Sequence, residues 1–382
     1  MSYIQYIFWQ NTNSLHQSAF FKALAEKNPG CVTLVVTEKL PDSRKEMGWF
    51  EPELPGVQVV KFLNNSFDWK MFIKKNNSKS CIHIFSGIAA FRNVQMVFEF
   101  AAASKCRIGI FTEPLDFRGI KGSIRRLRGY YHKIKYSSKI ELVLTTGDLG
   151  VKQFWDWGYN RNKIFEWAYT VEKSDNQVRY FPDESGKYRI LFAGSLIKRK
   201  GFDILISALE KLSSDNFIAD FYCLSEKQLH LEEDLKVNSI ASINNKLAFH
   251  PFVSNQKLRS LMNSYDLFVL PSRHDGWGAV VCESLMEGTP VLVSKFCGSS
   301  SIIKNNTIGS VIKELSSTKL SEQIHRGYLQ GRVTNTQRIW IRTWAEENIS
   351  GEAMAQYFER IVDYLNNSMI AKPDAPWQRN II

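Results

Sequence analysis

Residues Ser272–Ser294, with the sequence SRHDGWGAVVCESLMEGTPVLVS, decide the fold that we expect for the whole chain. The apolar run just before them is short, strand-forming and stopped by a proline, which is typical of a buried parallel strand. The expected elements are a strand over 266–271 (DLFVLP), a turn with Gly276 and Gly278, a helix over 279–287 that Gly288 ends, and a strand over 289–294 (TPVLVS). Strand, loop, helix and strand in this order predict one unit of a parallel α/β sheet.

Two carboxylates flank the start of the expected helix. Asp275 stands in the loop before it and Glu283 in its second turn, with seven residues between them. At a rise of about 1.5 Å per helical residue they lie on the order of 10 Å apart, too far to share a proton or a metal ion. Because a helix N-terminus presents unpaired N–H groups and a positive dipole end, we interpret the region as a site for an elongated ligand with phosphates at its middle. The alternative is that these acids only decorate a helix start, as acidic residues often do.

The run Asp275-Gly276-Trp277-Gly278, followed by Glu283 and then by GTPV at 288–291, resembles the E-x7-E signature of the family 4 glycosyltransferases of GT-B fold. Aspartate occupies the first acidic position here. The resemblance implies that Asp275 contacts the hydroxyls of the donor sugar and that Glu283 holds the ribose of the nucleotide. The residues expected to line the donor site at the helix start are Gly276, Trp277, Gly278, Ala279 and Val280.

A second motif is GSLIKRKG at Gly194–Gly201, which resembles the G-R-x-L-x-x-x-K-G region of the same family. The resemblance implies that Lys200 holds the donor diphosphate. Ser195 stands where arginine is frequent, so Arg199 is the candidate for the second phosphate contact. Fixed cations stabilise the negative charge that a leaving nucleoside diphosphate gains, and they do so without a metal.

Further donor contacts are expected from two later segments. Phe252 and Val253, in the run that leads into the acidic motif, are predicted to face the nucleobase. Gly298, in CGSSSII (297–303), is predicted to approach the sugar closely.

The first half of the chain alternates apolar runs with helical patterns, which predicts a doubly wound α/β domain. The expected strands are 2–10, 31–38, 57–62, 80–87, 106–113 and 140–147. Ligands gather at the carboxyl ends of such strands, which singles out His16, Gly87 and Glu113. Glu113 occupies the position where the family often has a histidine, so His16 and Glu113 are candidate catalytic residues. The alternatives are a polar residue in the first turn of a helix for His16 and a solvated loop acid for Glu113.

Length and composition limit the kind of protein. A chain of 382 residues exceeds one typical domain. The six cysteines form no CxxC pair, and the N-terminus lacks the pattern of a signal peptide, so we expect a reduced, cytoplasmic protein. No uncharged apolar run approaches the roughly 20 residues of a membrane span. The net charge of +11 therefore calls for an anionic partner, which can be nucleic acid, a membrane surface or a phosphorylated ligand.

The stretch 117–139, FRGIKGSIRRLRGYYHKIKYSSK, concentrates the positive charge and has no acidic residue. Ile124, Leu127, Tyr131 and Ile134 recur at helical spacing, which predicts a basic amphipathic helix. Its apolar edge can enter a lipid interface while the cations hold anionic head groups. The alternatives are a helix packed on its own domain with a solvated basic face and, less favoured because no recognition motif is present, a nucleic-acid contact.

We therefore expect a GT-B enzyme with two Rossmann-like doubly wound domains facing a central cleft. The predicted parts are an acceptor domain over 1–180, a nucleotide-sugar donor domain over 181–350, and a C-terminal helix and tail over 351–382 that pack back on the first domain. The predicted reaction is the transfer of a hexose from a nucleotide diphosphate donor, UDP favoured, to an acceptor hydroxyl, with retention of configuration and without a metal ion or other cofactor. The predicted acceptor is a lipid-linked or surface glycan, at the inner face of a membrane and with no nucleic acid involved. The alternative is a non-catalytic basic binding protein of the same fold with an anionic ligand.

Overall fold

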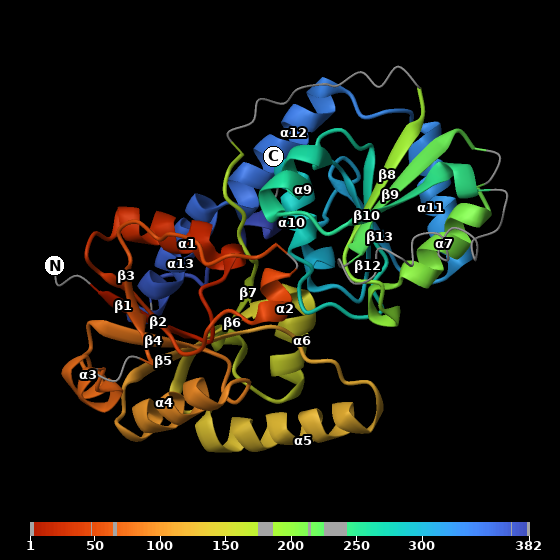
Figure 1. The fold of residues 1–382 in the computed structure, drawn as a ribbon. Helices are drawn as coiled ribbons and strands as arrows, with labels where there is room; N and C mark the ends of the chain where they lie inside the picture. The colour runs from red at the N-terminus through yellow and green to blue at the C-terminus, as the bar shows by residue number, and fades with distance from the viewer. Residues whose placement is uncertain are drawn as a thin grey trace. The chain divides into compact units, whose positions relative to one another are not determined.

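The computed structural model describes residues 4–46, 48–63, 67–174, 186–212, 215–224, 243–367 and 369–379 (Figure 1). The chain forms two compact units. Unit 1 comprises Met1–Pro41, Phe50–Glu172 and Ile349–Ile382, and unit 2 comprises Asp42–Trp49 and Lys173–Asn348. The predicted boundary at residues 180 and 181 lies outside the described residues.

Unit 1 contains a seven-stranded sheet in the order β3-β2-β1-β4-β5-β6-β7, and every neighbouring pair is parallel. The strands are β1 (Gln5–Gln10), β2 (Val32–Val36), β3 (Gln58–Lys61), β4 (Cys81–Ser86), β5 (Arg107–Thr112), β6 (Ile140–Thr146) and β7 (Ile164–Trp167). The helices are α1 (Leu15–Lys27), α3 (Trp69–Lys75), α4 (Arg92–Ala103), α5 (Gly119–Tyr136), α6 (Gly147–Asp156) and α13 (Gly351–Asn366), with short 3-10 turns η1 (Arg161–Lys163) and η6 (Pro376–Gln378). The predicted doubly wound α/β domain is confirmed, since helices cover both faces of the sheet (Figure 1).

The central strands are apolar on both faces because helices bury both faces of a parallel sheet. Trp9 of β1 is fully buried, with Phe85 of β4 stacked on it at a centroid distance of 5.9 Å. The Trp9 indole N–H donates to Nδ1 of His83 over 3.1 Å, and Nε2 of His83 donates to the Asn76 carbonyl over 3.1 Å. Burial lowers the pKa of His83 to about 4, so the ring is neutral at pH 7.

The C-terminal helix α13 belongs to unit 1, although α11 and α12 precede it in unit 2. Phe358 of α13 contacts Tyr6 and Phe20 edge-on, at centroid distances of 5.3 and 5.6 Å. Gly351 at the start of α13 lies against Ala19 of α1, where a Cβ atom would come within 2.2 Å of the carbonyl oxygen. A glycine is therefore required for the close approach of the two helices.

Unit 2 contains a six-stranded parallel sheet in the order β10-β9-β8-β11-β12-β13. The strands are β8 (Tyr188–Ala193), β9 (Phe217–Leu224), β10 (Leu247–Pro251), β11 (Leu267–Leu270), β12 (Val291–Ser294) and β13 (Gly309–Ile312). The helices are α2 (Asp42–Lys45), α7 (Phe202–Glu210), α9 (Asn255–Met262), α10 (Val280–Met286), α11 (Ser317–Leu329) and α12 (Asn335–Ile349), and the 3-10 turns are η2 (Lys198–Lys200), η4 (Asn244–Lys246) and η5 (Gly298–Ile302). The strand, loop, helix and strand predicted around 272–294 are thus β11, its loop, α10 and β12.

One segment departs from the predicted domain division. Asp42–Trp49, which the sequence assigned to the first domain, belongs to unit 2. Gly48 lies so close to the chain after β10 that a Cβ atom would be 2.9 Å from the Ser254 Cα atom and from the Val253 carbonyl oxygen. This packing joins residues some 200 positions apart in the printed sequence, so local sequence patterns do not reveal it.

Candidate functional site

The site of unit 2 lies where the strand order of its sheet reverses. The chain runs outward from β8 through β9 to β10 and then returns to the other side of β8 to form β11, β12 and β13. In open parallel sheets, ligands bind outside the carboxyl ends of the strands at this reversal, because the loops of the two central strands diverge there. The two loops concerned follow β8 and β11, and they carry the two motifs of the sequence.

Lys200 and Asp275 bring these loops together. The Lys200 Nζ atom lies 2.6 Å from Oδ2 of Asp275, and their side chains are 18% and 12% exposed. Arg199 lies beside them, with its Nη1 atom 3.8 Å from the same oxygen and donating to the His274 carbonyl over 3.1 Å. The structure thus places one aspartate and two cations within contact distance at the carboxyl edge of the sheet.

Gly201 allows this approach. Its φ of +74° is a left-handed conformation, and a Cβ atom would lie 1.9 Å from the Pro271 carbonyl oxygen at the end of β11. Gly194, at the end of β8, has a φ of +150°, and a Cβ atom there would lie 3.8 Å from the Lys200 side chain. Ser195 follows in the same loop, where its carbonyl accepts from the Ile197 amide.

The loop between β11 and α10 is fixed by η5. The Gly298 amide donates to the Asp275 carbonyl over 3.1 Å, and the Ser299 amide donates to the Trp277 carbonyl over 2.9 Å. A Cβ atom on Gly298 would lie 2.3 Å from the Gly276 carbonyl oxygen, so the two segments are in direct contact. Gly278, with a φ of +83°, turns the chain into the helix.

The residues expected at the start of α10 differ in the solvent exposure of their side chains. The helix begins at Val280 and Ala279 is its N-cap, so the helix is one residue shorter at each end than the predicted 279–287. The Trp277 side chain is only 1% exposed and belongs to the core. Ala279 is 9% exposed, and Val280 is half-buried.

Glu283 is buried in α10, and Asn255 holds it. The Asn255 Nδ2 atom donates to Oε1 of Glu283 over 2.8 Å. Asn255 begins α9, directly after the loop that contains Phe252 and Val253, both half-buried. Sequence reasoning missed Asn255; the signal was the capping serine of SNQK, which places the next residue at a helix start.

The thiols of this region are not nucleophiles. Burial first, and then the charge of Asp275, raise the pKa of Cys297 to about 12. Burial also raises the pKa of Cys282 in α10 to about 12. Both sulfurs are therefore protonated at neutral pH and pack as small apolar groups.

His16 and Glu113 lie in unit 1, where Tyr169 links them. The Tyr169 hydroxyl donates to Oε1 of Glu113 over 2.6 Å, and the His16 ring lies 5.9 Å from the Tyr169 ring. The His16 carbonyl also accepts from the Thr170 amide over 2.9 Å. Glu113 and Tyr169 follow the carboxyl ends of β5 and β7, as Gly87 follows β4, whereas His16 lies in the first turn of α1, the helix that follows β1. Sequence reasoning missed Tyr169, which lies in the aromatic-rich run 150–172.

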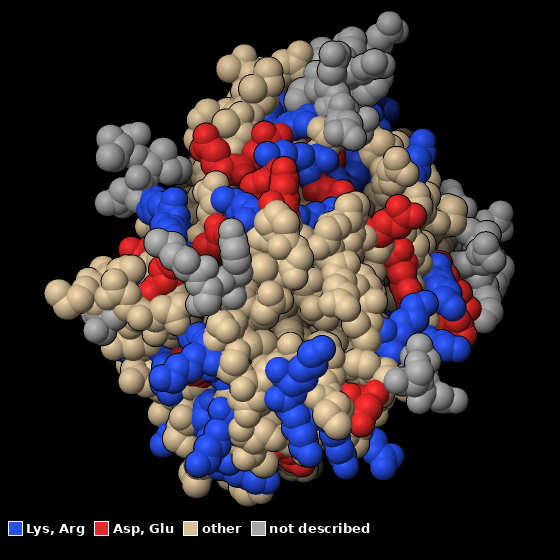
Figure 2. Space-filling view, turned by 90° about the vertical axis from the view of Figure 1, so that its left-hand side faces the viewer, with Lys and Arg blue, Asp and Glu red and all other residues tan. Residues whose placement is uncertain are grey.

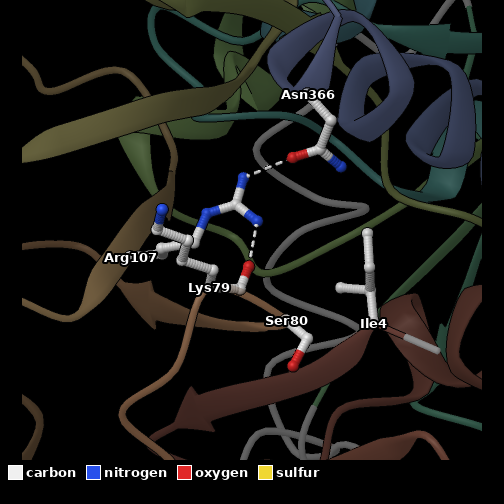
Figure 3. A pocket seen from close by; sticks show the side chains of 5 residues that line it. All are labelled: Ile4, Lys79, Ser80, Arg107 and Asn366. Atoms are coloured by element: carbon white, nitrogen blue, oxygen red, sulfur yellow. Dashed lines mark hydrogen bonds between the residues drawn. The ribbon is translucent and has the colours of Figure 1, made fainter. Parts of the chain in front are cut away.

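A different depression, of about 400 Å³, lies at the amino edge of the unit 1 sheet (Figure 3). Its lining residues are Ile4, Lys79, Ser80, Arg107 and Asn366. The Arg107 guanidinium donates to the Lys79 carbonyl over 2.7 Å and to the Asn366 side chain over 2.9 Å (Figure 3). This depression is open to solvent, and Arg107 in it joins β5 to α13. We therefore assign the depression a structural role.

The described residues contain neither a cluster of metal-ligand side chains nor a membrane-spanning helix. Within them, no three His, Cys, Asp or Glu side chains are grouped as a metal ion would require. None of the described helices combines the length and the apolar character that crossing a bilayer requires.

Comparison with known proteins agrees with this arrangement. Residues 174–342 match the family model described as glycosyl transferases group 1. An uncharacterized glycosyltransferase of Methanocaldococcus jannaschii is 26% identical over 205 residues, which are 51% of this chain and 52% of that protein. The O-antigen biosynthesis glycosyltransferase WclY of Escherichia coli is 30% identical over 107 residues, which are 27% of this chain and 28% of that protein. The matched segments thus span about half, or less, of these relatives.

The crystal structure of Anabaena HepE in complex with UDP covers 94% of this chain and 100% of its own, with 13% sequence identity and a TM-score of 0.68. At this identity the likeness concerns the fold alone. Two parallel α/β units with the strand orders given above are the GT-B fold, as predicted. The segment that matches the glycosyl transferases group 1 model lies within unit 2 and contains both motifs.

Proposed function

We propose that the protein is a glycosyltransferase that moves a sugar from a nucleotide diphosphate donor, with UDP-sugars favoured, to an acceptor hydroxyl. The observation that carries the proposal is the contact of 2.6 Å between Lys200 and Asp275, with Arg199 beside them, at the strand-order reversal of unit 2. A cation pair there fits a diphosphate, and the adjacent acid fits the hydroxyls of a sugar.

The two cations supply the chemistry of the leaving group. When the bond between the sugar and the diphosphate breaks, the diphosphate gains negative charge, and Lys200 and Arg199 stabilise that charge from fixed positions. Removing one such preorganised group typically costs about 2.7–4 kcal/mol in the transition state. Lys200 is the stronger contributor because its side chain is 18% exposed, against 42% for Arg199.

Lys200 and Asp275 form an ion pair with each other. Their charges neutralise each other, and both side chains take new partners when the donor binds. On donor binding, the phosphate takes the place of the aspartate at Lys200, and Asp275 accepts hydrogen bonds from the sugar. Donor binding therefore exchanges one charge pair for another and leaves no cation unpaired.

The nucleoside would lie toward α9 and α10. Glu283 is buried and accepts a hydrogen bond from Asn255, which fixes the carboxylate that we expect to accept from the ribose hydroxyls. Phe252 and Val253 precede Asn255 by three and two positions, so the expected base contact is next to the expected ribose contact. UDP is favoured because the structurally similar HepE was crystallised with UDP.

The finer parts of the proposal concern the acceptor. Glu113, His16 and Tyr169 in unit 1 supply a carboxylate, an imidazole and a phenol at one sheet edge, which suits an acceptor hydroxyl. The role of WclY in O-antigen biosynthesis favours a surface or lipid-linked glycan as acceptor. Retention of configuration follows from the resemblance of the acidic motif, and independence from metal follows from the use of Lys200 and Arg199 as the counter-charge.

A second candidate is a basic binding protein that keeps the fold and lacks the reaction. Two departures from the family pattern favour it: Ser195 stands where arginine is frequent, and Glu113 stands where histidine is common. In that case a nucleotide or another anion binds at Lys200, but no sugar is transferred or hydrolysed.

A panel of nucleotide sugars, read first by thermal shift and then by release of the nucleoside diphosphate, tests both candidates. A ligand at about 100 times its dissociation constant adds roughly 2.7 kcal/mol to the stability of the site that binds it. Stabilisation together with release of UDP supports the transferase, and stabilisation without release in the presence of glycan acceptors supports the binding protein. A product of inverted configuration, or a strict requirement for manganese after treatment with a chelator, would contradict the proposed mechanism.

A further inference from the structure

Helix α5 (Gly119–Tyr136) carries a stripe of large apolar side chains on its outer face. Ile120, Leu127 and Ile134 are 83%, 71% and 81% exposed, and Ile124 and Tyr131 between them are also exposed. At about 100° per residue, these five positions fall within roughly 80° of one another around the helix axis. They form one continuous stripe along almost the whole of the 18-residue helix.

The opposite face attaches the helix to unit 1. Gly122, Gly129 and Tyr136 are the buried residues of α5, and they recur every seven positions. A Cβ atom on Gly129 would lie 2.0 Å from the Trp157 ring, so the helix backbone itself rests on that indole. A helix on a protein surface normally turns its large apolar residues inward. In α5 two glycines and Tyr136 face inward, and the large apolar residues of the stripe face outward.

Positive charge surrounds the stripe. The helix contains six Lys and Arg residues and no acidic residue; they are Lys121, Arg125, Arg126, Arg128, Lys133 and Lys135. Lys121, Arg128 and Lys135 recur at seven-residue spacing along one margin of the stripe, and the Lys135 Nζ atom lies 5.6 Å from the centre of the Tyr131 ring. Figure 2 shows Lys and Arg gathered over the lower part of its view, the side on which α5 lies in Figure 1.

We propose that α5 is a membrane-docking helix that lies in the plane of a bilayer surface rich in anionic phospholipid. An exposed apolar stripe on a folded protein marks a surface that another phase or partner covers. A flat apolar stripe with cations at its margin is the pattern of helices that lie in the lipid interface, where the apolar side chains enter the acyl region and the cations contact head-group phosphates. Tyrosine side chains suit this boundary because one end of the ring is apolar and the other is polar.

Charge complementarity decides between a membrane and other occupants. A second copy of the helix would bring its six cations against those of the first, with no acid on either α5 to offset them. A nucleic acid would use the cations but would leave the five apolar side chains without a function. An anionic bilayer satisfies both features at once. The inference is independent of the proposed transferase activity.

Vesicle flotation of the full chain tests the inference. We expect the protein to float with vesicles of phosphatidylcholine that contain about one third phosphatidylglycerol, and to float at least about tenfold less with phosphatidylcholine alone, because several cations each add to the binding. The double variant Leu127→Ser/Ile134→Ser removes two outer side chains, and the triple variant Lys121→Gln/Arg128→Gln/Lys135→Gln removes the cationic margin. Each is expected to reduce recovery with the anionic vesicles at least about tenfold.

Matched controls lie in unit 2, away from α5 in the sequence. Leu329→Ser removes an equally exposed leucine, which is 70% exposed in α11, and Lys211→Gln/Lys313→Gln removes exposed cations. Both controls are expected to float like the unaltered protein. All variants should keep the same melting temperature and the same thermal shift with UDP, which separates lost docking from lost folding and from the proposed function.

Four outcomes would overturn the inference. Equal recovery with neutral and anionic vesicles would show that anionic lipid is not recognised. Unchanged recovery of the two α5 variants would show that the stripe and its cations do not bind the vesicles. A dimer in sedimentation that Leu127→Ser/Ile134→Ser dissociates would assign the stripe to a second copy. Binding of a generic RNA that the triple variant loses, without any flotation, would assign the cations to nucleic acid.

Discussion

Lys200→Met provides the sharpest test of the proposed donor site. The substitution keeps the length and the apolar stem of the side chain but removes the charge that lies 2.6 Å from Asp275. Because a preorganised cation is worth about 2.7–4 kcal/mol to a transition state that develops charge, we expect turnover to fall about 100- to 1,000-fold.

The stability of the variant should fall much less than its activity. Breaking a fully buried ion pair costs about 3–5 kcal/mol because the remaining charge is left uncompensated. Here Arg199 Nη1 remains 3.8 Å from the same Asp275 oxygen, and the pair is not fully buried. We therefore expect a loss of about 1–3 kcal/mol in the free energy of unfolding.

The assay is the release of UDP from the donor sugar that gives the largest thermal shift, with the acceptor and without it. Lys198→Met is the matched control, because Lys198 lies in the same 3-10 turn and its side chain is exposed. It should retain nearly full activity. We expect one fixed cation to raise turnover at least tenfold. The reasoning would be refuted if Lys200→Met kept turnover within about threefold of the unaltered protein, or if Lys198→Met lost as much turnover as Lys200→Met.

Four further changes test other parts of the structure. The pKa of His83 is lowered to about 4 from an ordinary 6.5, so its contribution to stability is present above pH 6.5 and is lost as the pH falls toward 4. In chemical denaturation over this pH range, we expect the free energy of unfolding to fall by about 3 kcal/mol more in the unaltered protein than in a His83→Gln variant, and parallel pH profiles of the two proteins would contradict this. Gly129→Ala places a Cβ atom 2.0 Å from an indole ring and should destabilise unit 1 by about 1–3 kcal/mol, whereas an unchanged melting temperature would show that α5 is not packed there. Gly298→Ala places a Cβ atom 2.3 Å from a carbonyl oxygen of the donor loop and should weaken UDP binding, measured by calorimetry; an affinity equal to that of the unaltered protein contradicts the close contact. Tyr169→Phe removes the 2.6 Å hydrogen bond to Glu113 and should lower kcat by about tenfold while the thermal shift with UDP is unchanged; a reduced UDP shift would place this cluster outside its proposed role.

Much of the fold could be predicted because it depends on local patterns. Each strand of unit 2 around the acidic motif is an apolar run bounded by glycine, proline or a polar loop, and β11, α10 and β12 lie within two residues of the predicted limits. The meeting of Lys200 and Asp275 follows from the order of parallel strands, since the loops after β8 and β11 must share one sheet edge.

The remaining features depend on contacts between distant parts of the chain. Nothing around Asn255 or Tyr169 shows which carboxylate each one contacts, because these hydrogen bonds span 28 and 56 positions. The spacing of Ile124, Leu127, Tyr131 and Ile134 predicted an amphipathic helix correctly. It could not show which face is outward, because that depends on the position of Trp157 under Gly129.

The segment Asp42–Trp49 has a practical consequence for work on donor specificity. It lies early in the chain but forms part of unit 2, where Gly48 is packed against the backbone of Val253 and Ser254. A recombinant fragment that starts at residue 173 lacks this buttress beside the expected base-binding loop. Chimeras intended to exchange the nucleotide preference between relatives should therefore transplant both Asp42–Trp49 and the part of unit 2 that begins at residue 173. A hybrid joined only near residue 173 would combine the base-binding loop of one parent with the packing segment of the other.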